Sequence, residues 1–436
     1  MSCIFKRILI LSIFTSPFFG VAQKNGIERK IVKSVDKHTP ASIDLLKQVV
    51  NINSGTMNFK GVRQVGAIFK TQLEELGFQT QLTSGEDFGR AGHLVATREG
   101  NSGPTFLLIG HLDTVFETDS PFQNSTMLND SIMNGPGVSD MKGGDVIIIL
   151  AMRALKDAGV LDKMNIKIVM TGDEEKSGSP LELSKKALID ASKKADIALG
   201  FEDGDGLSTT VVVSRRGSAD WHLEVSGNAA HSSQIFTEKV GNGAIYETAR
   251  ILTDFYNQLA GMENLTFNPG FILGGTSVQV DEDKTGGTAH GKTNVVAQKA
   301  VVNGDIRATS LEQLKKAQAI MEQIVSENYP KTSAKLSFQN GGYPPMALTK
   351  GNSELLQKYN QVSQDLGFGE VTAVNPRNAG AADISFTAEN VKMAADGLGL
   401  SGADGHTIHE TGNLDKLSMQ AKRAAVLMYR LSKEKQ

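Results

Sequence analysis

The chain has 436 residues, of which 40% are apolar and 21% are charged, and its formal net charge is −3. This composition is typical of a globular protein large enough for two domains, and it gives no support to nucleic-acid binding. The single cysteine, Cys3, lies near the amino end, which excludes disulfides and cysteine-ligated metal from the rest of the chain. Any metal must therefore be held by His, Asp and Glu, a set that suits zinc and also manganese or cobalt.

Residues 1–22 have the pattern of a secretory signal peptide. Lys6 and Arg7 precede an apolar stretch over residues 8–19, and small residues follow up to Ala22. The apolar stretch is too short to span a bilayer as an anchor. We predict cleavage after Ala22, a mature chain that begins at Gln23, and a secreted or periplasmic protein with no membrane partner.

The remaining elements predict an α/β domain interrupted by an inserted unit. Apolar spacing predicts helices within residues 26–77 and over 145–155, and strands at 93–96, 105–109, 166–170 and 195–201. Residues 214–340 then read as β-α-β-β-α-β, the ferredoxin-like plan, with a polar, glycine-rich mobile loop expected at 281–292. The main domain therefore comprises residues 23–213 and 341–436.

Candidate chemical groups stand where the predicted strands end. His111 and Asp113 follow the strand at 105–109 and alternate, so both side chains point the same way. In a metal site Asp113 would orient the His111 ring, although an isolated HxD is more often a structural histidine. The strand at 166–170 leads to Glu174 and Glu175, which alone would suggest only an acidic turn, and the strand at 195–201 leads to Glu202.

The glycine-rich segment NGPGVSDMKGG holds one more carboxylate, Asp140, ahead of the helix at 145–155. A glycine-rich helix start could bind phosphate, but the segment lacks the GK[ST] ending of a P-loop. A sharp turn that aims Asp140 is the better interpretation.

These motifs together resemble a known family. The order GHLDTV, GPGVSDMKGG, TGDEE, FED and GHTIHE is similar to that of the two-zinc exopeptidases and deacylases, which include glutamate carboxypeptidase, aminoacylases and succinyl-diaminopimelate desuccinylase. The resemblance covers nearly the whole mature chain. It implies a catalytic domain with a central mixed sheet flanked by helices, which binds two metal ions, and an inserted ferredoxin-like lid that also forms a homodimer.

Residue by residue, the resemblance implies two ligand sets and a base. One zinc ion would be bound by His111, Asp140 and Glu202, and the other by Asp140, Glu175 and His406. Glu174 would be the general base, and the peptide bond after Asp140 would be cis. Two alternatives stay open, because this chain has a second histidine, His409, and has Asp203 beside Glu202 where the family commonly has Glu-Pro.

The resemblance also assigns substrate groups to the lid. His231 would stabilise the oxyanion in the active site of the neighbouring subunit. Asn294 and Arg307 match the pair that binds the terminal carboxylate of the substrate, although a surface salt bridge is the simpler role for Arg307.

The sequence therefore predicts a secreted hydrolase that cleaves an amide bond in a small peptide or N-acyl amino acid. The first expectation is a carboxypeptidase that can release glutamate, with two Zn²⁺ ions, or Co²⁺ or Mn²⁺ in their place. An N-acyl-amino-acid deacylase or dipeptidase of the same family is the alternative. A non-catalytic binding protein on the same fold would lack ligands or base, all of which are present here. The missing phosphate loop disfavours a phosphate-directed hydrolase.

Overall fold

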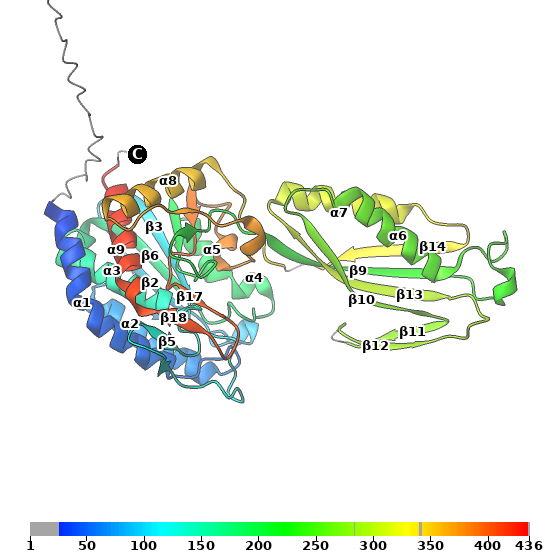
Figure 1. Ribbon diagram of the computed structural model, residues 1–436, viewed down its shortest axis with the longest axis horizontal. Coiled ribbons are helices and arrows are strands. Elements are labelled where there is room, and N and C mark those ends of the chain that lie inside the picture. Colours follow the sequence, from blue (N-terminus) through cyan, green and yellow to red (C-terminus); the bar gives the residue numbers. More distant parts are fainter. Residues whose placement is uncertain (1–25, 283, 340–341, 435–436) are drawn as a thin grey trace, which may run out of the picture.

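The structure is a computed structural model that describes residues 26–282, 284–339 and 342–434, so the predicted signal peptide lies outside the described residues. The chain forms two domains that lie end to end (Figure 1). The larger contains the first and last parts of the chain, and the smaller is the predicted insertion. No helix within the described ranges is long and apolar enough to cross a membrane.

A six-stranded mixed sheet forms the centre of the larger domain, as predicted. Its strands lie in the order β1-β2-β6-β3-β7-β16. β6, β3, β7 and β16 are parallel, whereas β2 runs antiparallel to both β6 and β1. The strands are β1 Gln79–Leu82, β2 Leu94–Arg98, β3 Ser102–His111, β6 Met164–Thr171, β7 Ile197–Gly200 and β16 Met393–Ala395.

Both faces of this sheet are covered, which explains the continuous apolar sequence of β3. Phe106 and Leu108 belong to the core formed with α1, α2, α3 and α9, whereas Leu107 and Ile109 pack on the other side with Leu188 of α5. The helices of the domain are α1 Gly26–Val50, α2 Phe59–Glu75, α3 Lys142–Asp157, α4 Leu181–Ser184, α5 Lys186–Ser192, α8 Lys350–Asp365 and α9 Leu414–Leu431.

Two small sheets complete the larger domain. One has the order β17-β18-β5-β4 and joins a segment near residue 130 to a segment near residue 410. The other pairs β8 with β15. Their strands are β4 Thr126–Met127, β5 Ile132–Asn134, β8 Thr210–Val211, β15 Thr372–Ala373, β17 Gly402–Ala403 and β18 Thr411–Asn413.

The smaller domain, which we call the lid, has the predicted ferredoxin-like topology. Its sheet order is β10-β13-β9-β14 with every neighbour antiparallel, and Trp221, Phe255 and Met321 belong to its own core between the sheet and two helices. The main elements are β9 Gly217–Gly227, α6 Gly243–Leu259, β10 Thr266–Gly275, β13 Lys299–Ala308, α7 Leu311–Ser326 and β14 Thr332–Phe338.

The expected mobile loop at 281–292 is in part a strand. β12 Gly287–His290 pairs with β11 Ser277–Val280 in an antiparallel ribbon next to β10. The prediction was wrong there because a polar, glycine-rich sequence is compatible with an exposed two-stranded ribbon as well as with a loop. Gly287 has a φ of 153°, which an L side chain rarely adopts, and its position beside Gln279 leaves no room for a Cβ atom.

Candidate metal centre and active site

The candidate residues of the first half of the chain meet at one edge of the central sheet. β3 ends at His111, β6 leads into Glu174 and Glu175, and β7 leads into Glu202. Because β6, β3 and β7 are parallel, their carboxyl ends lie at the same edge, where open α/β sheets place their ligands.

Asp140 and His406 reach this edge through the small sheet. β18 pairs with β5, with Thr411 opposite Asn134, so the loop that carries His406 lies beside the loop that carries Asp140. The Asp140–Met141 peptide bond is cis, as predicted. His406 itself has a left-handed backbone, with a φ of 62°.

The five predicted ligands form two groups that share Asp140. His111 Nε2 lies 3.1 Å from Asp140 Oδ1 and 3.4 Å from Glu202 Oε1. His406 Nε2 lies 3.0 Å from Asp140 Oδ2 and 3.2 Å from Glu175 Oε2. In each group the potential ligand atoms lie within 4.8 Å of one another. Asp140 therefore presents a different carboxylate oxygen to each group.

The donor set fits divalent metal ions. Imidazole and carboxylate are the ligands that zinc, manganese and cobalt accept, and a carboxylate between two such groups can bridge two ions. Oε1 of Glu175 is buried and has no hydrogen-bond partner among the residues that the structure describes. A buried, unpaired carboxylate oxygen is costly unless a cation or a donor satisfies it.

The structure also separates the two pairs of competing residues. Within the described ranges, the two groups contain Glu202 and His406, and neither Asp203 nor His409 belongs to them. His409 is exposed on the same loop.

Crowding of charge at this edge shifts several pKa values. Hydrogen bonds to Asp140 and then to Glu175 raise the pKa of His406 to about 11. Burial alone would lower the pKa of His111, but the neighbouring carboxylates, Glu202 first among them, raise it well above its usual value. Burial raises the pKa of Glu202 to about 7. The carboxylates thus favour positive charge at both histidines, as they would favour bound cations.

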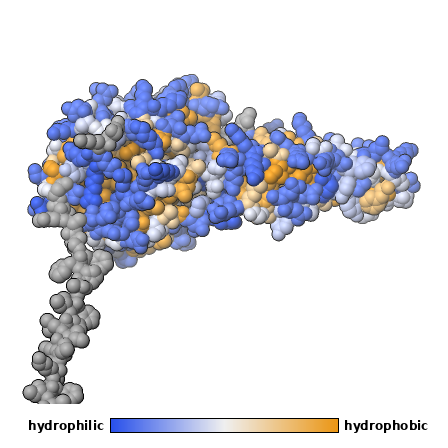
Figure 2. Space-filling view, turned by 90° about the horizontal axis from the view of Figure 1, so that it is seen from above, coloured by the Kyte–Doolittle hydropathy of each residue, from blue (hydrophilic) through white to orange (hydrophobic). Residues whose placement is uncertain are grey.

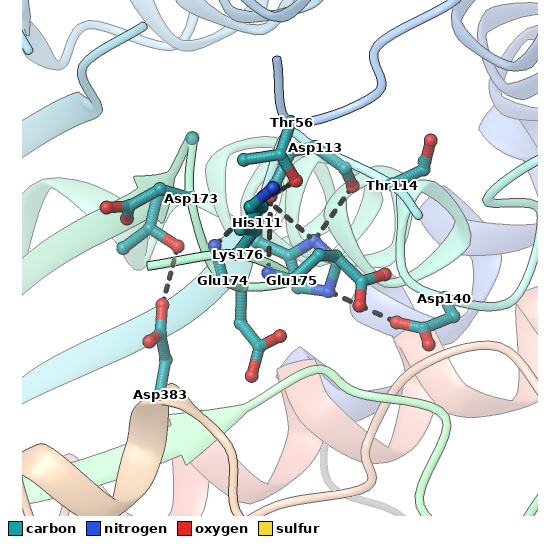
Figure 3. Close-up of polar contacts among 12 residues, drawn as sticks. Thr56, His111, Asp113, Thr114, Asp140, Asp173, Glu174, Glu175, Lys176 and Asp383 are labelled. Carbon is teal, nitrogen blue, oxygen red and sulfur yellow. Dashed lines mark hydrogen bonds and ion pairs between the residues drawn. The ribbon is translucent and has the colours of Figure 1, made fainter. Parts of the chain in front are cut away.

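Asp113 holds both His111 and the loop that follows β6 (Figure 3). His111 Nδ1 lies 3.0 Å from the Asp113 carbonyl oxygen and 3.5 Å from its carboxylate. The fully buried carboxylate also accepts hydrogen bonds from the Thr56 hydroxyl, at 2.7 Å, and from the backbone N–H groups of Glu174 and Glu175. The predicted partner of His111 thus also fixes the backbone of the adjacent acids.

Glu174 lies beside the two groups but in neither of them. Figure 3 shows its carboxylate directed away from the side on which Glu175 approaches Asp140. Burial, followed by the charge of Glu202, raises the pKa of Glu174 well above its usual value. A carboxylate with a raised pKa is a stronger base, and therefore a better proton acceptor, than an ordinary glutamate.

Glu410 supports the site although the sequence analysis assigned it no role. Its fully buried carboxylate accepts hydrogen bonds from the backbone N–H groups of Gly137, at 2.9 Å, Ser139, at 2.9 Å, and Asp140, at 3.1 Å. It therefore anchors the loop that aims the shared carboxylate. The only sign of this role in the sequence is an acidic residue directly before β18. The backbone groups that it binds could not be identified without knowing that β18 pairs with β5.

The lid residues with expected substrate roles lie at the two ends of the lid sheet. Ser232 N donates to Asn294 O, at 2.9 Å, so His231 and Asn294 are close, and both lie beyond the end of β9 that is remote from the larger domain. Arg307 lies opposite Ser218, at the near end. β13 runs between the two ends. At about 3.3 Å per residue, its residues Lys299 and Arg307 are about 26 Å apart, and Asn294 lies beyond Lys299. Within one subunit, Asn294 and Arg307 therefore cannot bind one carboxylate together.

Arg307 shows the simpler interaction that the sequence left open. Its Nε donates to Asp305 Oδ2 at 2.9 Å, and 39% of its side chain is exposed. An exposed pair of this kind leaves the guanidinium available to a ligand.

Comparison with known proteins supports the relationship that the motifs indicated. Carboxypeptidase G2 of Pseudomonas sp. (strain RS-16) is 24% identical over 403 residues, which is 92% of either chain. Succinyl-diaminopimelate desuccinylase of Gluconacetobacter diazotrophicus is 27% identical over 288 residues, covering 63% of this chain and 69% of that enzyme.

Solved structures share the fold. Aminopeptidase PepT from Bacillus cereus ATCC 10987 superposes with a TM-score of 0.71 at 18% identity, over 91% of this chain and 99% of that one. The Bacillus subtilis YXEP protein, named a dinuclear metal binding peptidase of the M20 family, has a TM-score of 0.63 at 14% identity, over 91% and 99%. The profile of peptidase family M20/M25/M40 matches residues 107–430. The chain therefore belongs to peptidase family M20/M25/M40 and is a hydrolase of the metallopeptidase class.

Proposed function

We propose that this protein is a two-zinc exopeptidase that removes the carboxyl-terminal residue of a small peptide, with glutamate as the first candidate for the released residue. The observation that carries the proposal is the shared Asp140, with one oxygen directed to His111 and the other to His406. The similarity to carboxypeptidase G2 over 92% of both chains supports the carboxypeptidase assignment.

Five side chains would hold the ions. His111, Asp140 and Glu202 would bind one, and Asp140, Glu175 and His406 the other. When bound, two divalent ions polarise the scissile carbonyl and lower the pKa of the attacking water. Zinc is the first choice, with Co²⁺ or Mn²⁺ as alternatives.

Glu174 would carry the proton. It takes a proton from the water as the water oxygen attacks the carbonyl carbon, and it returns that proton to the nitrogen as the C–N bond breaks. The products are a carboxylate and an amine. Asp113 keeps Glu174 in place, because its carboxylate accepts the Glu174 backbone N–H at 3.1 Å.

The remaining substrate contacts would come from a homodimer. His231 and Asn294 lie at the far end of the lid, out of reach of the metal groups of their own chain, so they would act in the site of a partner subunit. An apolar surface lies at this end: Phe236, Ile245 and Tyr246 are more than half exposed, and the Phe236 and Tyr246 rings are in contact. Figure 2 shows apolar residues at the tip of the lid. Arg307 would bind the substrate carboxylate from its own subunit.

A substrate screen tests the proposal. The zinc-loaded protein is incubated with alanyl-glutamate, benzoyl-glutamate, succinylated amino acids and amino-terminally cleavable tripeptides, and the released amine is measured. Faster release from the glutamate compounds is expected. Preferential hydrolysis of the succinylated compounds would favour a deacylase, to which the desuccinylase relative points. The absence of turnover in all arms, with two ions bound, would indicate a non-catalytic binding protein.

We also propose export of the protein, on the basis of the signal-like residues 1–22. Amino-terminal sequencing of protein recovered outside the cytoplasm should begin at or near Gln23. Retention of Met1 in that fraction would contradict the proposal.

A further inference from the structure

The chain crosses between the two domains twice, and the two crossing segments pair with each other. Arg215 and Met346 exchange two backbone hydrogen bonds, at 2.9 and 3.0 Å, and Ser218 N donates to Tyr343 O at 2.9 Å. A Cβ atom at Gly217 would lie 2.7 Å from the Tyr343 carbonyl oxygen, so the pairing needs a glycine there. The connection is thus a short antiparallel ribbon.

One side chain of this ribbon reaches the loop that carries Glu174. The Tyr343 hydroxyl donates to the Glu174 backbone carbonyl at 2.8 Å and lies 2.9 Å from the Ser177 hydroxyl. A tyrosine hydroxyl has one proton, and the carbonyl can only accept it, so the Ser177 hydroxyl donates to Tyr343. The Tyr343 ring packs against Phe386 with 4.9 Å between centroids, and the Lys185 ammonium lies 5.5 Å from its centre.

The other anchors of this loop come from the larger domain. Asp113 accepts the N–H groups of Glu174 and Glu175, and Arg90 donates to the carbonyls of Lys176 and Ser177, each at 2.7 Å. Glu174 is therefore held on its N–H side by Asp113 and on its C=O side by Tyr343. These two contacts fix the peptide planes on either side of the Glu174 Cα atom, and hence the direction in which the Glu174 side chain leaves the loop.

We propose that Tyr343 is a positioning residue for the Glu174 base. Through Tyr343, the base is connected to the segment that leads out of the lid. The inference rests on the proposed role of Glu174. Tyr343 touches neither the metal groups nor the reacting atoms, and it acts through one hydrogen bond to the backbone of the residue that moves the proton.

The test uses Tyr343→Phe in the zinc-loaded, full-length protein, with alanyl-glutamate or benzoyl-glutamate as substrate. This change removes only the hydroxyl and keeps the packing of the ring. We expect kcat to fall about 10- to 100-fold, because a small misplacement of a catalytic group has an effect of this size, while KM changes less than about 2-fold. Ser177→Ala leaves the bond to Glu174 intact and should change kcat less than about 3-fold.

Tyr359→Phe is the matched control. Its hydroxyl is buried in α8 and lies 3.1 Å from Gln420 Oε1, on the helical side of the domain. Losing either hydroxyl should lower the unfolding temperature by a similar amount, but Tyr359→Phe should leave kcat unchanged. Equal losses of kcat in both variants would overturn the proposal, as would a kcat for Tyr343→Phe within about 3-fold of the unmodified protein.

Two further measurements separate this inference from the proposed function. In the Glu174→Gln background, Tyr343→Phe should add less than about a 2-fold loss, because both changes act on one group. A full additional loss would overturn the inference, whereas an undiminished turnover of Glu174→Gln itself would refute Glu174 as the base.

Independently of activity, amide hydrogen exchange in residues 173–178 should increase in Tyr343→Phe and not in Tyr359→Phe. Unchanged exchange in that segment would also overturn the inference.

Discussion

Glu174 and Glu175 are neighbours in the sequence, yet the structure predicts different outcomes when each is replaced by glutamine. Glu175 Oε2 lies 3.2 Å from His406 Nε2 within one candidate ligand group, whereas Glu174 belongs to neither group. The contacts that hold the loop at Glu174 are made by its backbone, to Asp113 and Tyr343. Glutamine at position 174 therefore removes a proton acceptor and leaves the loop intact.

The expected sizes follow from these roles. Glu174→Gln should lower turnover by about 10²- to 10⁴-fold, the range for loss of a general base, and should keep both ions. Glu175→Gln leaves Asp140 and His406 to hold one ion. Losing a residue that only hydrogen-bonds to a metal ligand typically weakens metal binding roughly 10- to 100-fold. Because Glu175 would be a ligand itself, its loss should weaken binding of that ion by more than this.

The assay combines metal analysis with kinetics. Each variant is dialysed against metal-free buffer, its zinc content per subunit is measured, and turnover is then recorded over a series of zinc concentrations. Glu175→Gln should recover part of its activity in excess zinc, whereas Glu174→Gln should not respond. The assignment is refuted if Glu174→Gln loses zinc while Glu175→Gln retains both ions and its activity.

Three further predictions concern residues around this pair. Glu410→Gln should weaken metal binding about 10- to 100-fold, because it disturbs the loop of the shared carboxylate, and equilibrium dialysis should show this loss; unchanged affinity would contradict the anchoring role. Since the pKa of His406 is raised to about 11 and that of His111 is also raised, the metal-free site is protonated at neutral pH. Zinc binding should therefore release protons and tighten as pH rises, and calorimetry in buffers of different ionisation enthalpy measures both effects; pH-independent affinity would be inconsistent with these shifts. Mixing inactive His231→Ala with inactive Glu174→Ala protein should restore partial activity when subunits exchange, and no recovery despite proven exchange would show that His231 does not act across a dimer.

The central sheet, and the edge of it at which acids and a histidine follow the strands, could be predicted from the sequence because they depend on local pattern and strand direction, whereas the ligand roles came from the family resemblance. An apolar run that ends in His111, or a strand that leads to Glu175, places the side chain at a known edge once the strands are parallel. The family resemblance supplied His406, whose position depends on pairing between distant segments.

What the sequence could not show depends on contacts between distant parts of the chain. Glu410 reaches the Asp140 loop only because β18 pairs with β5, and Tyr343 reaches Glu174 only because the two crossing segments pair. Asn294 and Arg307 lie at opposite ends of β13, so a shared contact with one substrate carboxylate would need two subunits. A strand rise of about 3.3 Å per residue already implies this separation from the sequence.

The interruption of the larger domain by the lid has a consequence for the order in which the protein folds during synthesis. The lid is continuous in sequence and has its own core, so it can fold as soon as it emerges. The larger domain cannot, because β16 and α9 follow the lid and α9 packs on α1 and α3, with Arg430 bonded to Glu28 at 2.9 Å. Four of the five candidate ligands precede the lid, and His406 follows it. A nascent chain thus contains the residues of the first ligand group before the lid is made, but it cannot complete the second group until the segment after the lid has been added.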